Sequence, residues 1–363
     1  MKIKYIITLL IIVLFTNQTI QAQRAVQALY LSSKSKSADS NWFAAYCQAE
    51  YSEAHRLLTE QDTPPPKNQF LTNAQLYAYQ KGKTQRPKVD AWGMEFYQDF
   101  PKTTIEWGKE KQVKLPLKRN LFEAVIEGDT FRVVFDTGGQ GISVSKQLVE
   151  KYGYAKDTTI SGMSYLPAFK RTSKQSPTII KEISFGSITL KNLKAKFTTD
   201  VIEEGQLKSD QQYDVFMGVD ILIGLIDFIR FDWMNEELTF AKEPIAMTEP
   251  QDFFFFDAKP ITITHLEEKP LTTLIDTGSP VDVLSYDSYK DSYTKKEEKK
   301  YGDYAYHVYT VPIEMGTTTF NLGVADYMYG FKLKLDGEII DLIIGTGHRQ
   351  LTLNLRDNLL EVR

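Results

Sequence analysis

Two short stretches of this sequence combine a carboxylate with the small residues of a tight turn. One is FRVVFDTGGQGISVS, which begins at Phe131, and the other is LTTLIDTGSPVDVLS, which begins at Leu271. In each stretch an apolar run leads into Asp-Thr-Gly, with Asp136 and Asp276 as the acids. Acidic residues are depleted in strands and are rarely buried without a partner. A carboxylate that directly follows an apolar strand therefore indicates chemistry, and a second copy in matched surroundings makes an accidental match much less probable.

Paired carboxylates have a defined acid–base chemistry. Two carboxyl groups about 3 Å apart cannot both ionise cheaply, so they share one proton. The ionised group accepts a proton from water, and the protonated group hydrogen-bonds to a carbonyl oxygen. This chemistry needs no covalent intermediate, so we expect no cofactor and no metal. The four His residues show no metal-ligand spacing, and the single Cys, Cys47, is predicted to be a buried apolar residue.

The surroundings of the two motifs also repeat. One Asp-Thr-Gly alone would be interpreted as a turn, because Asp and Gly are common turn residues. Three further pairs of segments follow in the same order: EISFGSITLKNLKAKF and PIEMGTTTFNLGVADY, DVFMGVDIL and DLIIGTGHR, LIDFIRFDWMNEELTF and LTLNLRDNLLEVR. The first pair is typical of two strands joined by a Gly turn, at Gly186 and Gly316. A β-rich unit of domain size is therefore predicted to occur twice.

Two ordered Asp-Thr-Gly motifs, each followed by an apolar-apolar-Gly element, resemble the pepsin and retropepsin-like aspartic peptidases. The resemblance covers residues from about 111 to 363. It implies a mainly β fold with two β-barrel lobes related by a pseudo-twofold axis, in which the two motif loops meet between the lobes. The apolar-apolar-Gly segments, residues 215–218 and 342–345, would then thread behind the loops.

The resemblance also assigns roles to the residues of each motif. The acids, Asp136 and Asp276, would be catalytic. The supporting residues would be their neighbours in the two loops: Thr137, Gly138, Thr277, Gly278 and Ser279. Each Thr would hydrogen-bond to the opposite loop, and each Gly would let backbone N–H groups approach the carboxylates.

The two motifs differ at the residue that follows Asp-Thr-Gly, which is Gly139 in the first and Ser279 in the second. A hydroxyl that donates to a carboxylate lowers its pKa. We therefore expect Asp276 to ionise more readily and Asp136 to hold the proton that the pair shares. Gly139→Ser should then move the lower limb of the pH–rate profile.

The family resemblance also implies a hairpin flap over the substrate. The candidate in the first lobe lies between Asp157 and Ser176, where Gly162 and Pro167 offer turn chemistry. An ordinary surface loop explains this segment equally well, so no flap residue is assigned.

The N-terminus is typical of an exported protein. Lys2 and Lys4 precede an apolar run, and TNQTIQAQ follows, so residues 1–22 are predicted to be a secretory signal peptide. We expect a periplasmic or extracellular location and no membrane span after its removal. The formal net charge is -4 with no long basic run, which argues against nucleic acid as a partner.

The chain divides into a region with helical patterns and a longer region with strand patterns. Residues 23–110 are predicted to be a small helical module, with helices over residues 42–58 and 72–81. The module is either an accessory domain or a propeptide, because the basic residues 81–88 would suit a cover for the acids. Lobe one is expected at 111–246 and lobe two at 247–363. The charged residues 290–300 are predicted to form a solvated loop or helix face.

These observations predict an exported aspartic endopeptidase that binds an extended polypeptide and completes its active site within one chain, without a homodimer. Two alternatives stay open. One is a catalytically inactive peptide-binding or scaffold protein on the same fold, since a fold is not an activity. The other is carbohydrate processing, where paired carboxylates also act. The presence of both acids disfavours the first, and the lack of aromatic residues clustered beside the motifs disfavours the second.

Overall fold

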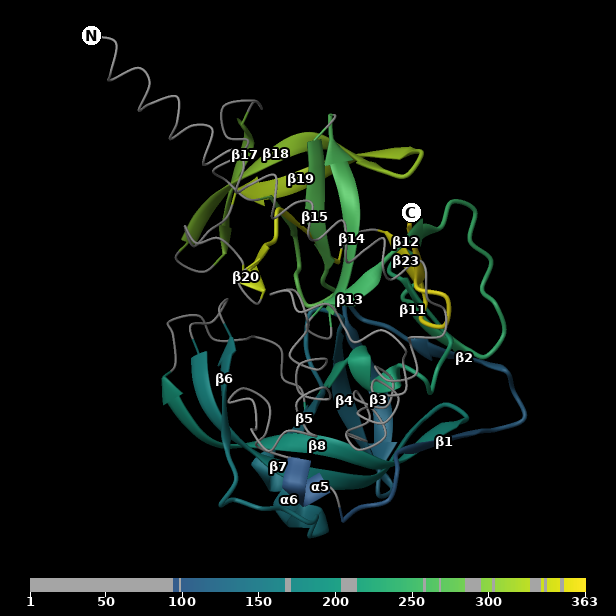
Figure 1. Cartoon of the computed structure of the whole chain (residues 1–363), viewed down its shortest axis with the longest axis vertical. Coiled ribbons are helices and arrows are strands. Elements are labelled where there is room, and N and C mark those ends of the chain that lie inside the picture. Colours follow the sequence, from purple (N-terminus) through teal and green to yellow (C-terminus); the bar gives the residue numbers. More distant parts are fainter. Residues whose placement is uncertain are drawn as a thin grey trace, which may run out of the picture.

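The computed structural model describes residues 94–97, 99–166, 171–203, 214–256, 259–267, 269–284, 295–301, 304–326, 334–335, 338–346 and 349–363. The predicted signal peptide, residues 1–22, lies outside these ranges. So does most of the predicted helical module, including both of its predicted helices, 42–58 and 72–81. Within the described ranges the chain is mainly β, as predicted (Figure 1).

Each predicted lobe has its own eight-stranded sheet. The sheet of lobe one contains β1 (Thr104–Trp107), β3 (Leu121–Ile126), β4 (Asp129–Asp136), β5 (Ile142–Val144), β6 (Gly162–Leu166), β7 (Arg171–Phe185), β8 (Ile188–Glu203) and β9 (Val215–Gly218). The sheet of lobe two contains β13 (Phe254–Phe256), β14 (Lys259–Leu266), β15 (Lys269–Ile275), β16 (Asp282–Leu284), β17 (Lys295–Tyr301), β18 (Tyr304–Met315), β19 (Thr318–Asp326) and β22 (Leu342–Ile344).

The pattern of apolar and polar residues in the strands matches the pattern of buried and exposed side chains in the sheet. In β3, Phe122, Ala124 and Ile126 are buried and alternate with more exposed residues, as expected for a strand with one face on the core. The end of β4 is apolar on both faces and buried throughout residues 133–135. This continuous burial arises because β4 lies in the middle of the sheet, between β3 and β9.

The two sheets share one topology. In lobe one the strands run β8-β5-β9-β4-β3-β7, and pairing of β7 with β8 closes the sheet into a barrel. In lobe two the corresponding order is β19-β16-β22-β15-β14-β18, closed by pairing of β18 with β19. The strand that carries each motif is parallel to the strand of its apolar-apolar-Gly segment, β4 to β9 and β15 to β22. This duplicated topology matches the unit that the sequence repeat predicts.

A third sheet joins the lobes. Its order is β12-β24-β23-β10-β11-β2, with β2 (Gln112–Pro116), β10 (Phe228–Asp232), β11 (Glu237–Ala241), β12 (Gln251–Asp252), β23 (Gln350–Asn354) and β24 (Leu359–Val362). The central strands β10 and β23 pair antiparallel and come one from each lobe. The sheet is symmetric about this central pair, which places a pseudo-twofold axis between the lobes. A small separate sheet pairs β20 (Lys334–Leu335) with β21 (Glu338–Ile339).

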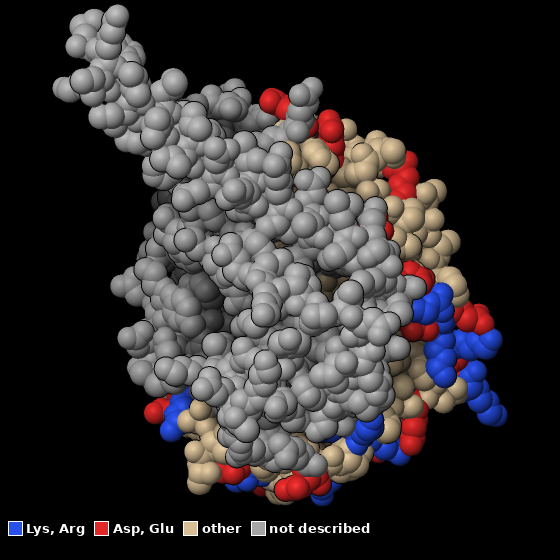
Figure 2. Space-filling model, in the orientation of Figure 1, with Lys and Arg blue, Asp and Glu red and all other residues tan. Residues whose placement is uncertain are grey.

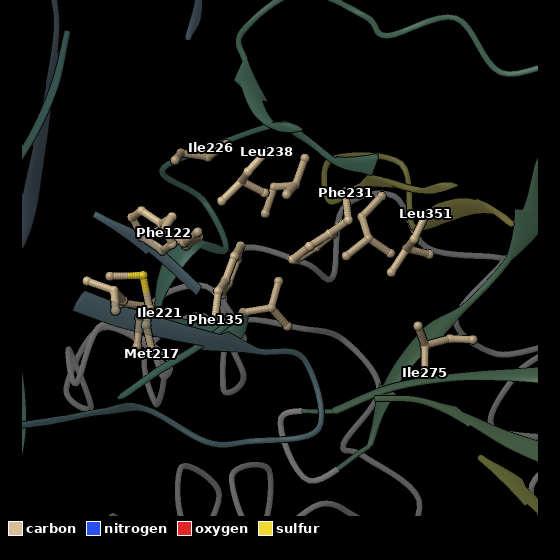
Figure 3. Packing of buried hydrophobic residues seen from close by; sticks show 14 of the residues in the cluster. Phe122, Phe135, Met217, Ile221, Ile226, Phe231, Leu238, Ile275 and Leu351 are labelled. Carbon is tan, nitrogen blue, oxygen red and sulfur yellow. The ribbon is translucent and has the colours of Figure 1, made fainter. Parts of the chain in front are cut away.

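The hydrophobic core runs without interruption from lobe one into the joining sheet. Phe135, which precedes the first acid, packs against Phe231 of β10 with ring centroids 5.1 Å apart. Figure 3 shows Phe231 between Phe135 and Leu351, a residue of β23. Aromatic contacts of this kind contribute about 0.5–1.5 kcal/mol beyond the burial of their area. The strand that carries Asp136 is therefore held by the core of the joining sheet.

Lobe one contains a helix that the sequence did not predict, and it is contacted by two elements from the region before residue 110. Helix α6 (Lys146–Tyr152) was not predicted; Ser145 caps it by accepting the N–H of Leu148, and it ends at Gly153. Before residue 110, the short helix α5 (Met94–Tyr97) and β1 contact lobe one. The Tyr97 hydroxyl donates to the carbonyl of Ala195, and β1 pairs with β8.

The prediction for residues 290–300 was wrong from residue 295 onward. Residues Lys295–Tyr301 form β17, which pairs with β18 at the edge of the lobe-two sheet. An edge strand is paired on one side only, and charged side chains are common there because they oppose edge-to-edge association. The charge run therefore marked an edge strand rather than a loop.

The described surface is mixed in charge. Figure 2 shows Lys and Arg side chains interspersed with Asp and Glu along the coloured margin of the molecule. Pairs such as Lys114–Glu237, 2.9 Å apart, link neighbouring strands of the joining sheet. Among the described residues, no helix has both the length and the apolar character to cross a membrane.

Candidate active site

Both acids lie where a central strand ends. Asp136 is the last residue of β4 and is in register with Gly218 of β9. Asp276 directly follows β15, and its N–H donates to the carbonyl of Ile344 in β22 at 2.9 Å. The turns that follow are here named the first motif loop, residues 136–141, and the second motif loop, residues 276–281. Each loop therefore leaves the same position of a duplicated sheet.

Four hydrogen bonds connect the two loops and the strand ends that precede them. The Thr137 N–H donates to the Thr277 hydroxyl oxygen at 2.9 Å, and the Thr277 N–H donates to the Thr137 hydroxyl oxygen at 3.0 Å. Each hydroxyl in turn donates across the interface, Thr137 to the carbonyl of Ile275 at 2.7 Å and Thr277 to the carbonyl of Phe135 at 2.9 Å. Both Thr residues are buried, so this reciprocal arrangement is shielded from water.

The glycines of the two motifs lie against the opposite acid. The N–H of Gly138 donates to Oδ1 of Asp136 at 2.8 Å, and the N–H of Gly278 donates to Oδ1 of Asp276 at 2.9 Å. A Cβ on Gly138 would lie 2.4 Å from Cγ of Asp276, and one on Gly278 would lie 2.4 Å from Oδ2 of Asp136. Glycine is required at both positions because any side chain would enter the space of the carboxylate pair.

The pKa of Asp136 is raised well above its ordinary value. Burial is the main cause, and the neighbouring charge and hydrogen bond of Asp276 raise it further. The N–H groups of Gly138 and Gly278 act in the other direction. Protein atoms surround both carboxylates, yet each acid keeps part of its surface exposed. That remaining exposure gives water access to the pair.

The pKa of Asp276 is also raised, again mainly by burial. More groups around it favour the ionised form: the side chain of Asp136, the N–H groups of Gly278 and Ser279, and the positive charge of Lys259. These surroundings favour the sequence expectation that Asp276 is ionised while Asp136 holds the shared proton. The assignment of that proton stays a prediction.

The physical basis expected for this asymmetry was wrong in one respect. The Ser279 hydroxyl donates to the carbonyl of Val281 at 2.7 Å, so its hydrogen is not directed at Asp276. The backbone N–H of Ser279 acts on the acid instead. At the matching position a Cβ on Gly139 would lie 2.0 Å from the ring of Phe216, so Gly139→Ser would displace that ring and is not a clean probe of the proton's position.

Each lobe also has a second, supporting carboxylate, which connects the chain after the motif to the apolar-apolar-Gly segment. In lobe one, Asp220 accepts the N–H of Gly141. In lobe two, Asp282 accepts the N–H of Gly345 at 3.0 Å and pairs with both terminal nitrogens of the Arg349 side chain. Asp220 and Asp282 are not among the site residues that the sequence predicts. The signal was present, because Asp220 lies two residues beyond a buried strand, the same kind of position that marked the motif acids.

A hairpin occupies the segment proposed for the flap. β6 pairs antiparallel with β7, from Gly162 opposite Gln175 to Leu166 opposite Arg171, while residues 167–170 lie outside the described ranges. In lobe two, β17 and β18 form the corresponding hairpin. Whether the first hairpin covers a bound substrate stays a prediction.

No group of three or more His, Cys, Asp or Glu side chains among the described residues is arranged to hold a metal ion.

Comparisons with known proteins found a family match and a similarity to solved structures. Residues 122–224, which contain the first motif loop and β9, match the aspartyl protease family. A retropepsin-like aspartic protease from Rickettsia conorii is 20% identical in sequence, with 39% of this chain and 94% of that chain covered and a TM-score of 0.24. No curated protein matches the chain. The resemblance predicted from the paired motifs is confirmed by the family match: over residues 122–224 this chain is similar to the retropepsin/pepsin-like aspartic peptidases.

Proposed function

We propose that this protein is an exported aspartic endopeptidase in which Asp136 and Asp276 activate water to hydrolyse peptide bonds. The observation that carries the proposal is the reciprocal hydrogen bonding of Thr137 and Thr277. This contact brings the motif loops of both lobes together and holds two carboxylates with raised pKa values against each other. In such pairs two neighbouring carboxyl groups share one proton, so one acts as an acid while the other acts as a base.

The proposed reaction uses one proton held by the pair. Ionised Asp276 takes a proton from water as the water oxygen bonds to the scissile carbonyl carbon. Protonated Asp136 donates to the carbonyl oxygen, which yields a tetrahedral diol and leaves Asp136 ionised. The proton now on Asp276 passes to the departing amine as the C–N bond breaks. Asp136 regains its proton from the diol as the carbonyl re-forms, so the pair returns to its starting state.

The proposed substrate is an extended polypeptide. β6 stands at the end of the lobe-one sheet, and the main chain of a peptide can add to such an edge as a further strand. Both acids belong to one chain, so the proposed site needs no second copy. Export is proposed from the N-terminal sequence alone, with periplasmic or extracellular location as its consequence.

The first experiment is peptide hydrolysis by residues 23–363, measured from acidic to neutral pH on a mixed peptide library. Asp136→Asn and Asp276→Asn are the test variants, since Asn keeps the size and the hydrogen-bond acceptor of Asp but cannot exchange the proton. Both variants should abolish cleavage and keep the melting temperature of the wild type or raise it. Cleavage that survives both substitutions contradicts the mechanism. A folded wild type that binds peptides without cutting them favours the inactive peptide-binding alternative.

A further inference from the structure

In each lobe a supporting carboxylate connects the chain after the motif to the chain after the apolar-apolar-Gly strand. The carboxylate belongs to the second of these segments in lobe one and to the first in lobe two. In lobe two, Asp282 of β16, after the motif, accepts the N–H of Gly345, which comes later in the chain, just after β22. In lobe one, Asp220 follows β9 and accepts the N–H of Gly141, which comes earlier in the chain, in the first motif loop. In both lobes a carboxylate thus ties the chain after the motif to the apolar-apolar-Gly strand. Only in lobe one does that carboxylate bind the motif loop itself.

The contact between Asp220 and the first motif loop is close and buried. Both carboxylate oxygens of Asp220 accept the Gly141 N–H, at 2.9 and 3.0 Å, and the residue is only 5% exposed. The carbonyl of Gly141 accepts the N–H of Gly218 at 2.7 Å. The peptide groups on both sides of Gly141 are therefore held, and its φ of 69° is a left-handed conformation that favours glycine.

The packing around Gly218 keeps this contact in place. A Cβ on Gly218 would lie 2.5 Å from Oδ1 of Asp220 and 2.9 Å from the carbonyl oxygen of Gly139. Gly218 is also in register with Asp136. The backbone of Gly218 therefore lies next to both Asp136 and the side chain of Asp220. The absence of a side chain here lets the carboxylate approach the loop.

A short path leads from Asp220 to the first acid. Gly141 ends the loop in which Gly138 donates to Oδ1 of Asp136 at 2.8 Å. A displacement of Gly141 would therefore be passed through two residues to the donor that orients the acid. A shift of about 1 Å in such a site is enough to lower a rate by about 100-fold.

Charge also distinguishes Asp220 from its counterpart in lobe two. Burial raises the pKa of Asp220 to about 6, against the effects of the Gly141 N–H and the charges of Lys196 and Lys259. Lys196 comes from β8 and Lys259 from β14, so both lobes contribute positive charge near this carboxyl group. In lobe two, Arg349 pairs with Asp282 directly.

We propose that Asp220 is a positioning residue, which fixes Gly141 through its side-chain oxygens and thereby sets the first motif loop and the orientation of Asp136. The effect on rate rests on the proposed function, whereas the effect on the loop does not. A neutral hydrogen-bond acceptor of the same shape should serve as well as the carboxylate, since the Gly141 N–H needs an acceptor rather than a charge.

The test compares Asp220→Ala, Asp220→Asn and Gly218→Ala with the wild type. Asp232→Ala is the matched control, because Asp232 is another buried acid that accepts a backbone N–H, but on the joining sheet. Two quantities are measured: amide hydrogen exchange in fragments that contain residues 136–142, and kcat and KM on a library-derived peptide. Exchange of the loop can be read whether or not the protein cleaves peptides.

Asp220→Ala should speed exchange of residues 136–142 by about tenfold or more and lower kcat by a similar factor, with KM nearly unchanged. In Asp220→Asn, loop exchange and kcat should both stay near the wild-type values. Gly218→Ala should also speed loop exchange, and it serves as the second route if Asp220→Ala does not fold. Asp232→Ala should lower the melting temperature without changing loop exchange or kcat.

Wild-type loop exchange in a folded Asp220→Ala would overturn the proposal. So would an Asp220→Asn variant that is damaged as severely as Asp220→Ala, because that result would require the charge. If the wild type cleaves no peptide, the proposed function fails, while loop exchange alone still decides the role of Asp220.

Discussion

The two motif acids are both followed by Thr-Gly, but their surroundings in the structure differ. Asp136 faces the charge of its partner, whereas Asp276 also receives the N–H of Ser279 and the field of Lys259. Because both pKa values are raised by burial, the pair should keep one proton well above the pH at which free carboxyl groups lose theirs. The difference between the acids therefore comes from atoms outside the Asp-Thr-Gly motif.

The glycines that lie against these acids give a prediction at the residue scale. Gly278→Ala should reduce peptide hydrolysis by about 100-fold or more, because its Cβ would lie 2.4 Å from Oδ2 of Asp136. The control is Gly128→Ala, where nothing lies within 4 Å of the added Cβ although φ is 90°. That control should lose stability through backbone strain and keep its activity. Equal activity in both variants would contradict this account of the site.

The reciprocal Thr contact gives a second residue-scale prediction. Thr137→Val keeps the shape of the side chain but leaves the N–H of Thr277 and the carbonyl of Ile275 without their partner. Each buried group left unpaired costs about 1–3 kcal/mol, so the free energy of unfolding should fall by about 2–6 kcal/mol. Chemical denaturation measures it. The control is Thr264→Val, which breaks a hydroxyl contact with Thr273 inside lobe two and should cost less.

At the scale of elements, the strands that carry the acids are held by what lies behind them. β4 and β15 each pair in parallel with the apolar-apolar-Gly strand of their own lobe. A supporting carboxylate then ties the chain after each motif to that strand. The loops are therefore fixed at both ends, by the sheet before the acid and by a side chain after it.

The pKa of Asp220 gives a prediction with a definite sign. Its folded-state pKa is raised to about 6, above the ordinary value of 3.8, so folding favours the protonated form. Its contribution to stability is then greatest below pH 4 and is lost as the pH rises toward 6 and above. Two pKa units correspond to about 3 kcal/mol as an upper limit.

Asp220→Asn removes this titration, so its stability relative to the wild type should increase between pH 4 and pH 7. Denaturant unfolding across that range measures the difference. Asp232→Asn is the control of opposite sign, because hydrogen bonds from Asn235 and Gln350 lower the pKa of Asp232 despite its burial. Relative to the wild type, that variant should lose stability as the pH rises through the ordinary value of 3.8, and the difference should be flat above about pH 5, where the Asp220→Asn difference still grows. A flat difference for Asp220→Asn would contradict the assignment.

At the scale of the whole molecule, the lobes are joined twice. The first connection is the joining sheet, in which β10 pairs with β23. The second is the set of hydrogen bonds between the two motif loops. The core is continuous through Phe135, Phe231 and Leu351 (Figure 3). Neither lobe can lose its structure without exposing apolar surface of the other, so the two should unfold together.

Calorimetry tests this coupling. The full chain should show one unfolding transition for the two lobes, and Phe231→Ala should move the whole transition to lower temperature. Large-to-small changes at buried Phe cost about 3–5 kcal/mol. The control is Met234→Ala on the neighbouring turn, where the side chain is 73% exposed and little change is expected. Two separate transitions in the wild type would show that the lobes fold independently.

The sequence alone determined the mainly β class, the duplicated unit and the two carboxylates with their Thr and Gly neighbours. These follow from local patterns, because an acid after an apolar run and a Gly turn between strands are visible in the order of residues. It did not reveal α6, where the helix depends on the caps at Ser145 and Gly153, and it misjudged the charge run that forms β17.

Only the tertiary structure decided the partners of the site residues. Asp220 and Gly141 are 79 positions apart, and Thr137 and Thr277 are 140 apart, so no local pattern records either contact. The Ser279 hydroxyl was expected at Asp276 and donates instead to Val281, because the turn directs it away from the acid. Residue types fix which chemistry is possible, whereas long-range packing fixes which atoms face one another, and the balance of burial, charge and hydrogen bonds at each carboxyl group follows from that packing.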